Sequence, residues 1–158
     1  MPVSAGVVGT AGASKSPAGA FLWTRDGGVS WSQASVSSPG AVAGVSALTC
    51  SPDGSCLALA SLGAVPNFTL VGLRSADGGK TWTAGPPTTY RSGGGSMFSA
   101  CGDASHCMAA FSSDSRAGGI VIATTANQGA TWSVSPAPPT WDNLATALSC
   151  ATGLDCSV

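Results

Sequence analysis

Glutamate is absent from this chain of 158 residues, and charged residues of all kinds make up only 8% of it. Seven acidic residues stand against six lysines and arginines, which gives a formal net charge of -1. A phosphate-rich partner needs a cluster of cations that displaces its counterions. Because the chain has no such cluster, we expect no nucleic-acid partner.

Long apolar runs and helix-forming residues are also scarce. No apolar stretch reaches the length of about 18 residues that a membrane-spanning helix needs, so we expect no membrane span. The first residues, 1–14, lack the basic and apolar segments of a signal peptide. Twenty-two glycines and ten prolines favour short strands joined by turns. An all-β fold follows.

One eight-residue pattern occurs three times, as TRDGGVSW from Thr24, SADGGKTW from Ser75 and TANQGATW from Thr125. The final tryptophans are 51 and 50 residues apart (82 − 31 and 132 − 82). A short acidic or amide side chain accepts backbone N–H bonds in a turn, glycine adopts positive φ at low cost, and tryptophan offers a large apolar face. We therefore interpret the shared positions as structural: Asp26, Gly28, Trp31, Asp77, Gly79, Trp82, Asn127, Gly129 and Trp132.

Six cysteines form a second motif with the same period. They stand in three pairs, each separated by five residues, and each pair follows a motif tryptophan by 18 or 19 residues. Zinc usually takes pairs with closer spacing, whereas two strand ends across a five-residue turn come within disulfide range. We predict the disulfides Cys50–Cys56, Cys101–Cys107 and Cys150–Cys156, and we expect no metal and no cofactor.

The first motif resembles the Asp-box, or bacterial neuraminidase repeat, of sialidases, sortilin-type receptors, xyloglucanase-like glycoside hydrolases and photosystem II assembly-factor-like propellers. The families that share this repeat do different jobs, so the resemblance implies a fold and not an activity. Regular disulfides indicate an oxidising compartment. We therefore expect a secreted, periplasmic or cell-surface protein.

The two motifs divide each period into four short β runs, which in the second copy are 46–50, 56–61, 69–74 and 81–84. Four antiparallel strands repeated about every 50 residues are typical of a β-propeller blade. We predict one propeller segment over 1–158 with about three four-stranded blades. The expected blades are 1–36, which lacks its first strand, then 46–85, 97–135, and 146–158 as the start of another.

Closed propellers have about four to eight blades, so just over three leave an open edge. Either the segment belongs to a larger ring of six to eight blades in a longer chain, or identical chains complete the ring together.

Both motifs are expected at one edge of the blades, which leaves the variable connections at the opposite edge. These connections are 13–19, 62–67, 86–96, 112–119 and 136–143. Aromatic rings stack on sugars and guanidinium groups bind carboxylates, so we predict ligand contacts at Tyr90, Arg91, Arg116, Trp141 and Asp142. The alternative is that the aromatics pack between blades and the arginines are only solvated.

A sialidase-like reaction needs an arginine cluster, a tyrosine nucleophile with its glutamate, and an acid-base carboxylate. The chain has one tyrosine and no glutamate. We therefore expect a non-catalytic module that binds a protein or a glycan. The alternative hypothesis is a fragment of a sialidase-like Asp-box glycoside hydrolase whose catalytic residues lie outside this segment.

Overall fold

The structure is a computed structural model that describes residues 4–7, 21–64, 67–88, 91–113, 119–137, 148–151, 153 and 155–157. This part of the chain is all-β, as predicted, with several antiparallel sheets of which none is closed. It contains no helix, and therefore none that could cross a membrane.

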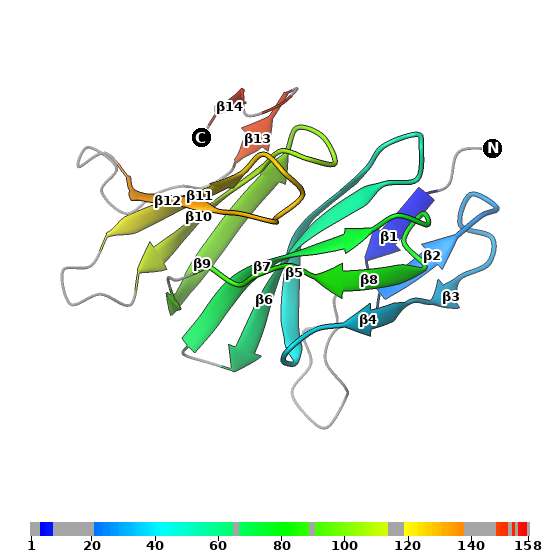
Figure 1. Cartoon of the computed structure of the whole chain (residues 1–158), viewed down its shortest axis with the longest axis horizontal. Helices are drawn as coiled ribbons and strands as arrows, with labels where there is room; N and C mark the ends of the chain where they lie inside the picture. Colours follow the sequence, from blue (N-terminus) through cyan, green and yellow to red (C-terminus); the bar gives the residue numbers. More distant parts are fainter. Residues whose placement is uncertain are drawn as a thin grey trace.

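The strands fall into successive units that follow the sequence repeat (Figure 1). The first unit is a three-stranded sheet of β1 (Ser4–Val7), β2 (Phe21–Thr24) and β3 (Ser32–Gln33). The second unit contains β5 (Val42–Cys50), β6 (Cys56–Ala64), β7 (Asn67–Ser75) and β8 (Thr81–Ala84). The third contains β9 (Arg91–Cys101), β10 (Cys107–Ser113), β11 (Ile120–Thr125) and β12 (Ser133–Pro136). A last hairpin consists of β13 (Ser149–Cys150) and β14 (Cys156–Ser157).

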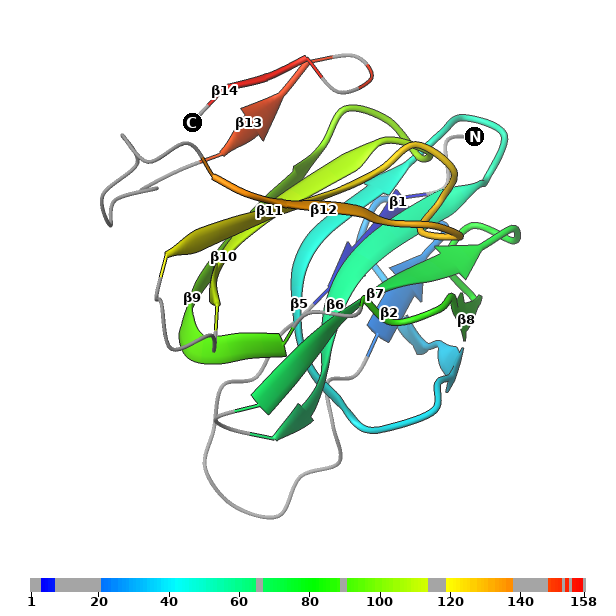
Figure 2. The ribbon, with the colours of Figure 1, turned by 60° about the vertical axis from the view of Figure 1, so that its left-hand side comes forward.

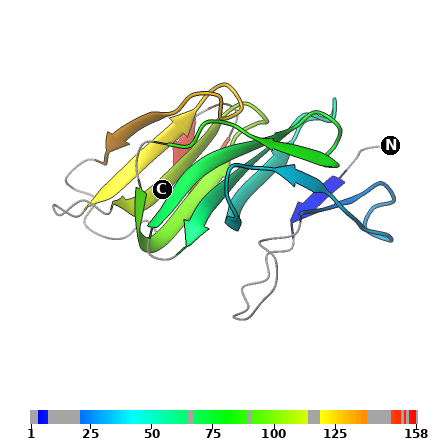
Figure 3. The same cartoon turned by 60° about the horizontal axis from the view of Figure 1, so that its bottom comes forward.

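In the second and third units each strand pairs antiparallel with the next one along the chain. Figure 3 shows the second unit between the blue strands of the first unit and the yellow and orange strands of the third. The residues from Cys56 to Ala60 in β6 are all buried, although they point alternately to the two faces of the sheet. The second unit is therefore covered on both faces.

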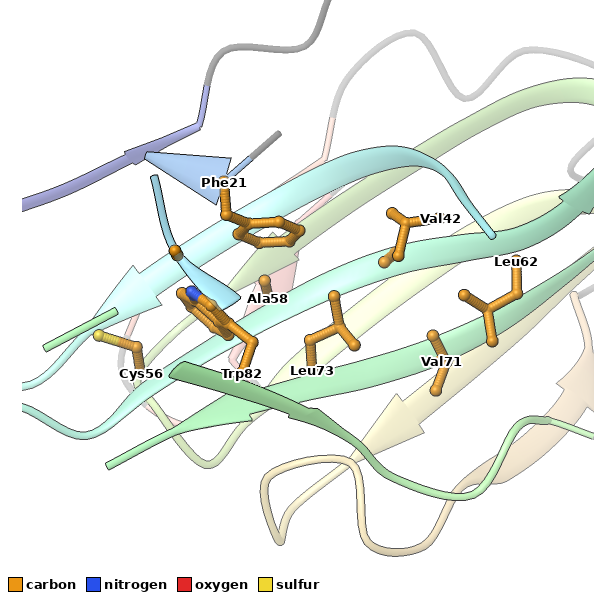
Figure 4. Close-up of a cluster of buried hydrophobic side chains, with 10 residues drawn as sticks. Phe21, Val42, Cys56, Ala58, Leu62, Val71, Leu73 and Trp82 are labelled. Carbon is orange, nitrogen blue, oxygen red and sulfur yellow. The ribbon is translucent and has the colours of Figure 1, made fainter. Parts of the chain in front are cut away.

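One apolar core lies between the first and second units. Phe21 comes from the first unit, whereas Ala58, Leu73 and Trp82 come from the second (Figure 4). The rings of Phe21 and Trp82 have centroids 5.0 Å apart. This core packs successive units against each other through side chains.

A second core lies between the second and third units. Leu57, Leu59 and Leu70 of the second unit contact the apolar face of the third, which includes Phe111 and Val121. In β11 the alternation of buried and partly buried residues places Val121 in this core and leaves Ile122 on the opposite face. Each unit thus offers one face to the unit before it and the other to the unit after it.

The units are joined by strand pairing as well as by side chains, whereas separate antiparallel blades would contact each other through side chains alone. Residues Phe68 and Thr69 of β7 pair with the first residues of β9, which merges the second and third units into one sheet. In addition, β4 (Ser35–Ser37) runs parallel to β8. This parallel pairing joins two units, whereas the pairing within each unit is antiparallel as predicted. The edge of β8 away from β7 provides backbone groups that the chain after the first unit can bind.

Two segments that the sequence predicted as connections, 62–67 and 86–96, are partly strand. β6 and β7 continue to a short link at 65–66, and β9 already begins at Arg91. The glycine-rich start of β9 has no side-chain alternation that would predict a strand. Its pairing arises from contact with β7 and with β10, where the register shifts between Phe111 and Ser113.

Candidate functional site

The three repeated segments 24–31, 75–82 and 125–132, called here the tryptophan turns, connect the third and fourth strands of their units. In the second turn the Ser75 hydroxyl donates to Asp77 (2.8 Å) and accepts from the Gly79 N–H (2.9 Å). The Asp77 carboxylate accepts from the N–H groups of Lys80 and Thr81, both at 3.0 Å, and from the Thr81 hydroxyl at 2.7 Å. This network ties both ends of the turn to one carboxylate.

The same bonds set the charge state of Asp77. Partial burial opposes its ionisation, but the hydrogen bonds from Thr81, Ser75 and Lys80 outweigh burial and lower the pKa of Asp77 to about 2. Gly78 and Gly79 have φ of 72° and 87°, which a residue with a side chain rarely adopts. Asp77 is therefore an ionised part of the turn and not a proton donor at neutral pH.

The first tryptophan turn has the same network. Thr24 bonds to Asp26 at 2.7 Å and accepts from the Gly28 N–H at 3.0 Å, while Ser30 donates to Asp26 through both its hydroxyl and its N–H. The hydrogen bond from the Ser30 hydroxyl, followed by the bond from its N–H, lowers the pKa of Asp26 well below its ordinary value. The network forms although this turn is largely exposed.

The third tryptophan turn uses an amide in place of the carboxylate. Asn127 accepts from the Thr131 N–H at 2.9 Å and donates to the Thr131 hydroxyl at 2.8 Å. The Gly129 N–H donates to Thr125 at 2.9 Å. Gln128 has a φ of 58° where the other two turns have glycine. The turn thus keeps its shape without a charge.

The tryptophans themselves differ in their surroundings. The Trp82 indole donates to the Gly79 carbonyl at 2.8 Å, and its side chain is only 2% exposed. The Trp31 indole makes the equivalent bond to Gly28 at 3.0 Å but is 46% exposed. The buried Trp132 Nε1 has no hydrogen-bond partner among the described residues. The bond to glycine thus forms with the exposed ring of Trp31 and with the buried ring of Trp82, but not with Trp132.

The predicted disulfides are present at all three segments 50–56, 101–107 and 150–156, called here the cysteine turns. In each pair the two cysteines lie opposite each other on neighbouring strands, with Cα atoms 4.0–4.1 Å apart. Inside the first turn, the Ser55 N–H donates to Asp53 at 2.9 Å. In the second turn, Asp103 accepts from the Ser105 N–H at 2.7 Å. The aspartates thus close the turns.

His106 is also part of its cysteine turn. Its Nδ1 lies 2.9 Å from both carboxylate oxygens of Asp103, and its N–H donates to the same group. The bond from Ser105, followed by the bond from His106, lowers the pKa of Asp103. Within the part of the chain that the structure describes, no cluster of three metal-binding side chains occurs.

The cysteine and tryptophan turns of one unit bind each other. In the second unit the Gly78 N–H donates to the Gly54 carbonyl at 2.9 Å, and in the third the Gln128 N–H donates to Ser105 at 3.1 Å. The cysteine turns line the upper side of Figure 2. Both motifs of a unit therefore lie at one edge, called here the turn edge.

Two contacts of the turn edge were not predicted from the sequence. Arg25 and Lys80 lie 5.1 Å and 5.3 Å from the ring of Trp23, which joins the first two units. In addition, the third tryptophan turn packs tightly on the second unit, because a Cβ atom built on Gly72 would lie 2.8 Å from the Gly129 Cα atom. The glycine on β7 was the available signal, since it interrupts the apolar run from Leu70 to Leu73.

Of the five predicted ligand residues, the structure places only the backbone of one. Arg91 begins β9, whose other end is Cys101 at the turn edge, so Arg91 lies at the opposite edge beside Thr69. The remaining four fall outside the described residues: Tyr90, Arg116, Trp141 and Asp142. Whether the five come together remains a prediction.

No family model, curated protein or solved structure matches the chain.

Proposed function

We propose that the chain is part of a β-propeller of Asp-box repeats that acts outside the cytoplasm as a non-catalytic module binding a protein or a glycan. The packing of the units supports the propeller. Two consecutive four-stranded meanders follow the repeat, and an apolar core lies between each pair of neighbouring units. Radial packing of four-stranded sheets has this organisation.

The three disulfides in a small β domain suggest an oxidising extracellular environment. A secreted, periplasmic or cell-surface location would provide that environment. Free cysteines do not occur in the chain. The proposal therefore predicts that the protein folds in the disulfide form and functions after export.

One observation carries the binding proposal, namely the contrast between the two edges of the units. At the turn edge, disulfides and hydrogen bonds use the aspartates Asp26, Asp53, Asp77 and Asp103 for structure. At the opposite edge the connections differ in length, with two residues between Ala64 and Asn67 but six between Ser113 and Ile120. Variable connections on a regular scaffold are common binding sites.

A glycan array tests the proposal directly. The chain should retain glycans without hydrolysing them, and Arg91→Ala should weaken retention by about tenfold or more, as is typical of a residue central to binding. Arg25→Ala is the matched control, because this exposed arginine lies at the turn edge. Turnover of a glycoside, or loss of retention in the Arg25 variant alone, contradicts the proposal.

A further inference from the structure

Gln128 is the one described residue other than glycine whose backbone has a positive φ. Its φ of 58° lies in the left-handed region, which glycine enters freely and a residue with a side chain enters only against steric repulsion. The equivalent residues of the other two tryptophan turns are Gly27 and Gly78, with φ of 73° and 72°. The third turn therefore keeps a backbone shape suited to glycine but has glutamine there.

The hydrogen bonds of Gln128 do not explain the glutamine. Its backbone N–H donates to the Ser105 carbonyl, but the Gly78 N–H donates to Gly54 in the same way in the second unit. Within the described part of the chain, the Gln128 side chain makes no hydrogen bond and no ion pair. A glycine would therefore keep the observed bond and relieve the strain. A strained backbone without a compensating bond indicates that the residue has another role.

The residue before Gln128 also differs from its equivalents. It is Asn127, whereas the other two turns have aspartate. Asparagine is a thermolabile residue. When glycine follows it, the glycine backbone nitrogen attacks the side-chain amide carbon, a C–N bond forms, and ammonia leaves with the proton of the attacking N–H. Water then opens the cyclic imide to aspartate or isoaspartate. A side chain on the attacking residue hinders this reaction, so glycine at position 128 would favour it most.

The aspartates of the other turns can precede glycine safely. An ionised carboxylate is a poor target for the same attack, because it has no ammonia to release. Asp26 and Asp77 are ionised at neutral pH, since the pKa of each lies below its ordinary value. The whole sequence follows the same rule. None of its three asparagines is followed by glycine, whereas three of its seven aspartates are.

We propose that Gln128 protects Asn127 against deamidation, and that this protection accounts for the strained backbone of the third tryptophan turn. The harmful product is isoaspartate, because it places an additional carbon atom in the main chain of the turn. Aspartate itself would keep the turn, since Asp26 and Asp77 accept equivalent bonds in the other two.

Peptide mapping by mass spectrometry, after prolonged incubation of the disulfide form at slightly alkaline pH, tests the proposal. Gln128→Gly should convert Asn127 to aspartate and isoaspartate several-fold faster than the unchanged protein does. Gln128→Ala is the matched control, because it removes the amide of glutamine but keeps a side chain on the attacking residue. It should convert more slowly than Gln128→Gly. Equal rates in Gln128→Gly and the unchanged protein overturn the proposal.

The first tryptophan turn provides an independent check. Asp26→Asn places an asparagine before Gly27 and should make position 26 deamidate. Adding Gly27→Gln should slow this reaction several-fold, and the site has room for the side chain, since nothing lies within 4 Å of a Cβ atom built on Gly27. Equal rates with and without Gly27→Gln contradict the proposal.

The stability of fresh Gln128→Gly protein separates protection from a structural role of the glutamine. The proposal predicts a higher urea midpoint than that of the unchanged protein, because glycine adopts positive φ without strain. A lower midpoint would show that the glutamine side chain itself stabilises the turn, and it would overturn the proposal.

Discussion

The first and second tryptophan turns have the same local chemistry but different surroundings. Asp26 and Asp77 accept equivalent bonds, and Trp31 and Trp82 both donate to a glycine carbonyl three residues earlier. Of these two rings only Trp82 is buried, because Phe21 of the first unit packs against it. The motif therefore builds the turn, and the neighbouring unit decides whether its tryptophan stabilises the fold.

We expect the largest loss of stability when the Trp82 ring is removed. Trp82→Ala should lower the free energy of unfolding by about 3–5 kcal/mol, because it leaves a cavity in the core between two units. Trp31→Ala, the matched control, should cost less than about 1 kcal/mol in dilute protein, as is usual for an exposed site. Urea denaturation measures both.

Removal of the disulfide Cys50–Cys56 in the second unit should cause the next largest loss of stability. The first unit has Ser4 at the register position of Cys56, since Ser4 pairs with Thr24 as Cys56 pairs with Ser75. Replacing both Cys50 and Cys56 by alanine should cost about 2 kcal/mol, because a small loop is no longer closed in the unfolded chain.

The corresponding replacement of Cys150 and Cys156 is the control for this prediction. It should change the unfolding midpoint less, because β13 and β14 pair over only two residues each. An equal loss in both double variants, measured by thermal unfolding, would show that the disulfides do not act through the core of the second unit.

Packing between backbones of neighbouring units is the third test. Gly72→Ala should destabilise the protein by about 1–3 kcal/mol, because the new methyl group meets the backbone of Gly129. Gly40→Ala is the control, since nothing lies within 4 Å of its built Cβ atom. Equal unfolding midpoints for the two variants would contradict the close contact between the second and third units.

Acid sensitivity provides the smallest effect. The pKa of Asp77 is about 2 in the folded chain and 3.8 ordinarily, so its stabilisation is complete above the ordinary value and is lost as the pH falls through about 2. Asp77→Asn should flatten the dependence of unfolding free energy on pH across this window. It should change stability little at neutral pH, because Asn127 already binds Thr131 in the same way. If the unfolding free energy of Asp77→Asn depends on pH as it does in the unchanged protein, ionisation of Asp77 does not stabilise this turn.

Much of the fold could be predicted from the sequence, because it depends on short-range patterns. The Asp and Gly positions specify turns, and five-residue spacing places Cys50 opposite Cys56. What could not be predicted depends on contacts between units. The parallel pairing of β4 with β8 and the strand at the glycine-rich start of β9 arise from edges that meet only after the units assemble. The ligand residues were inferred from residue type and from their place in variable connections, and their grouping remains a prediction.

The central claim is that a tryptophan turn stabilises the protein by packing on the unit before it. A double-mutant cycle of Phe21→Ala and Trp82→Ala, measured by urea denaturation, tests this claim most directly. The two rings come from different units and lie 5.0 Å apart. The account predicts a coupling energy of about 0.5–1.5 kcal/mol, as found for paired aromatic rings. Strictly additive effects of the two substitutions would contradict it.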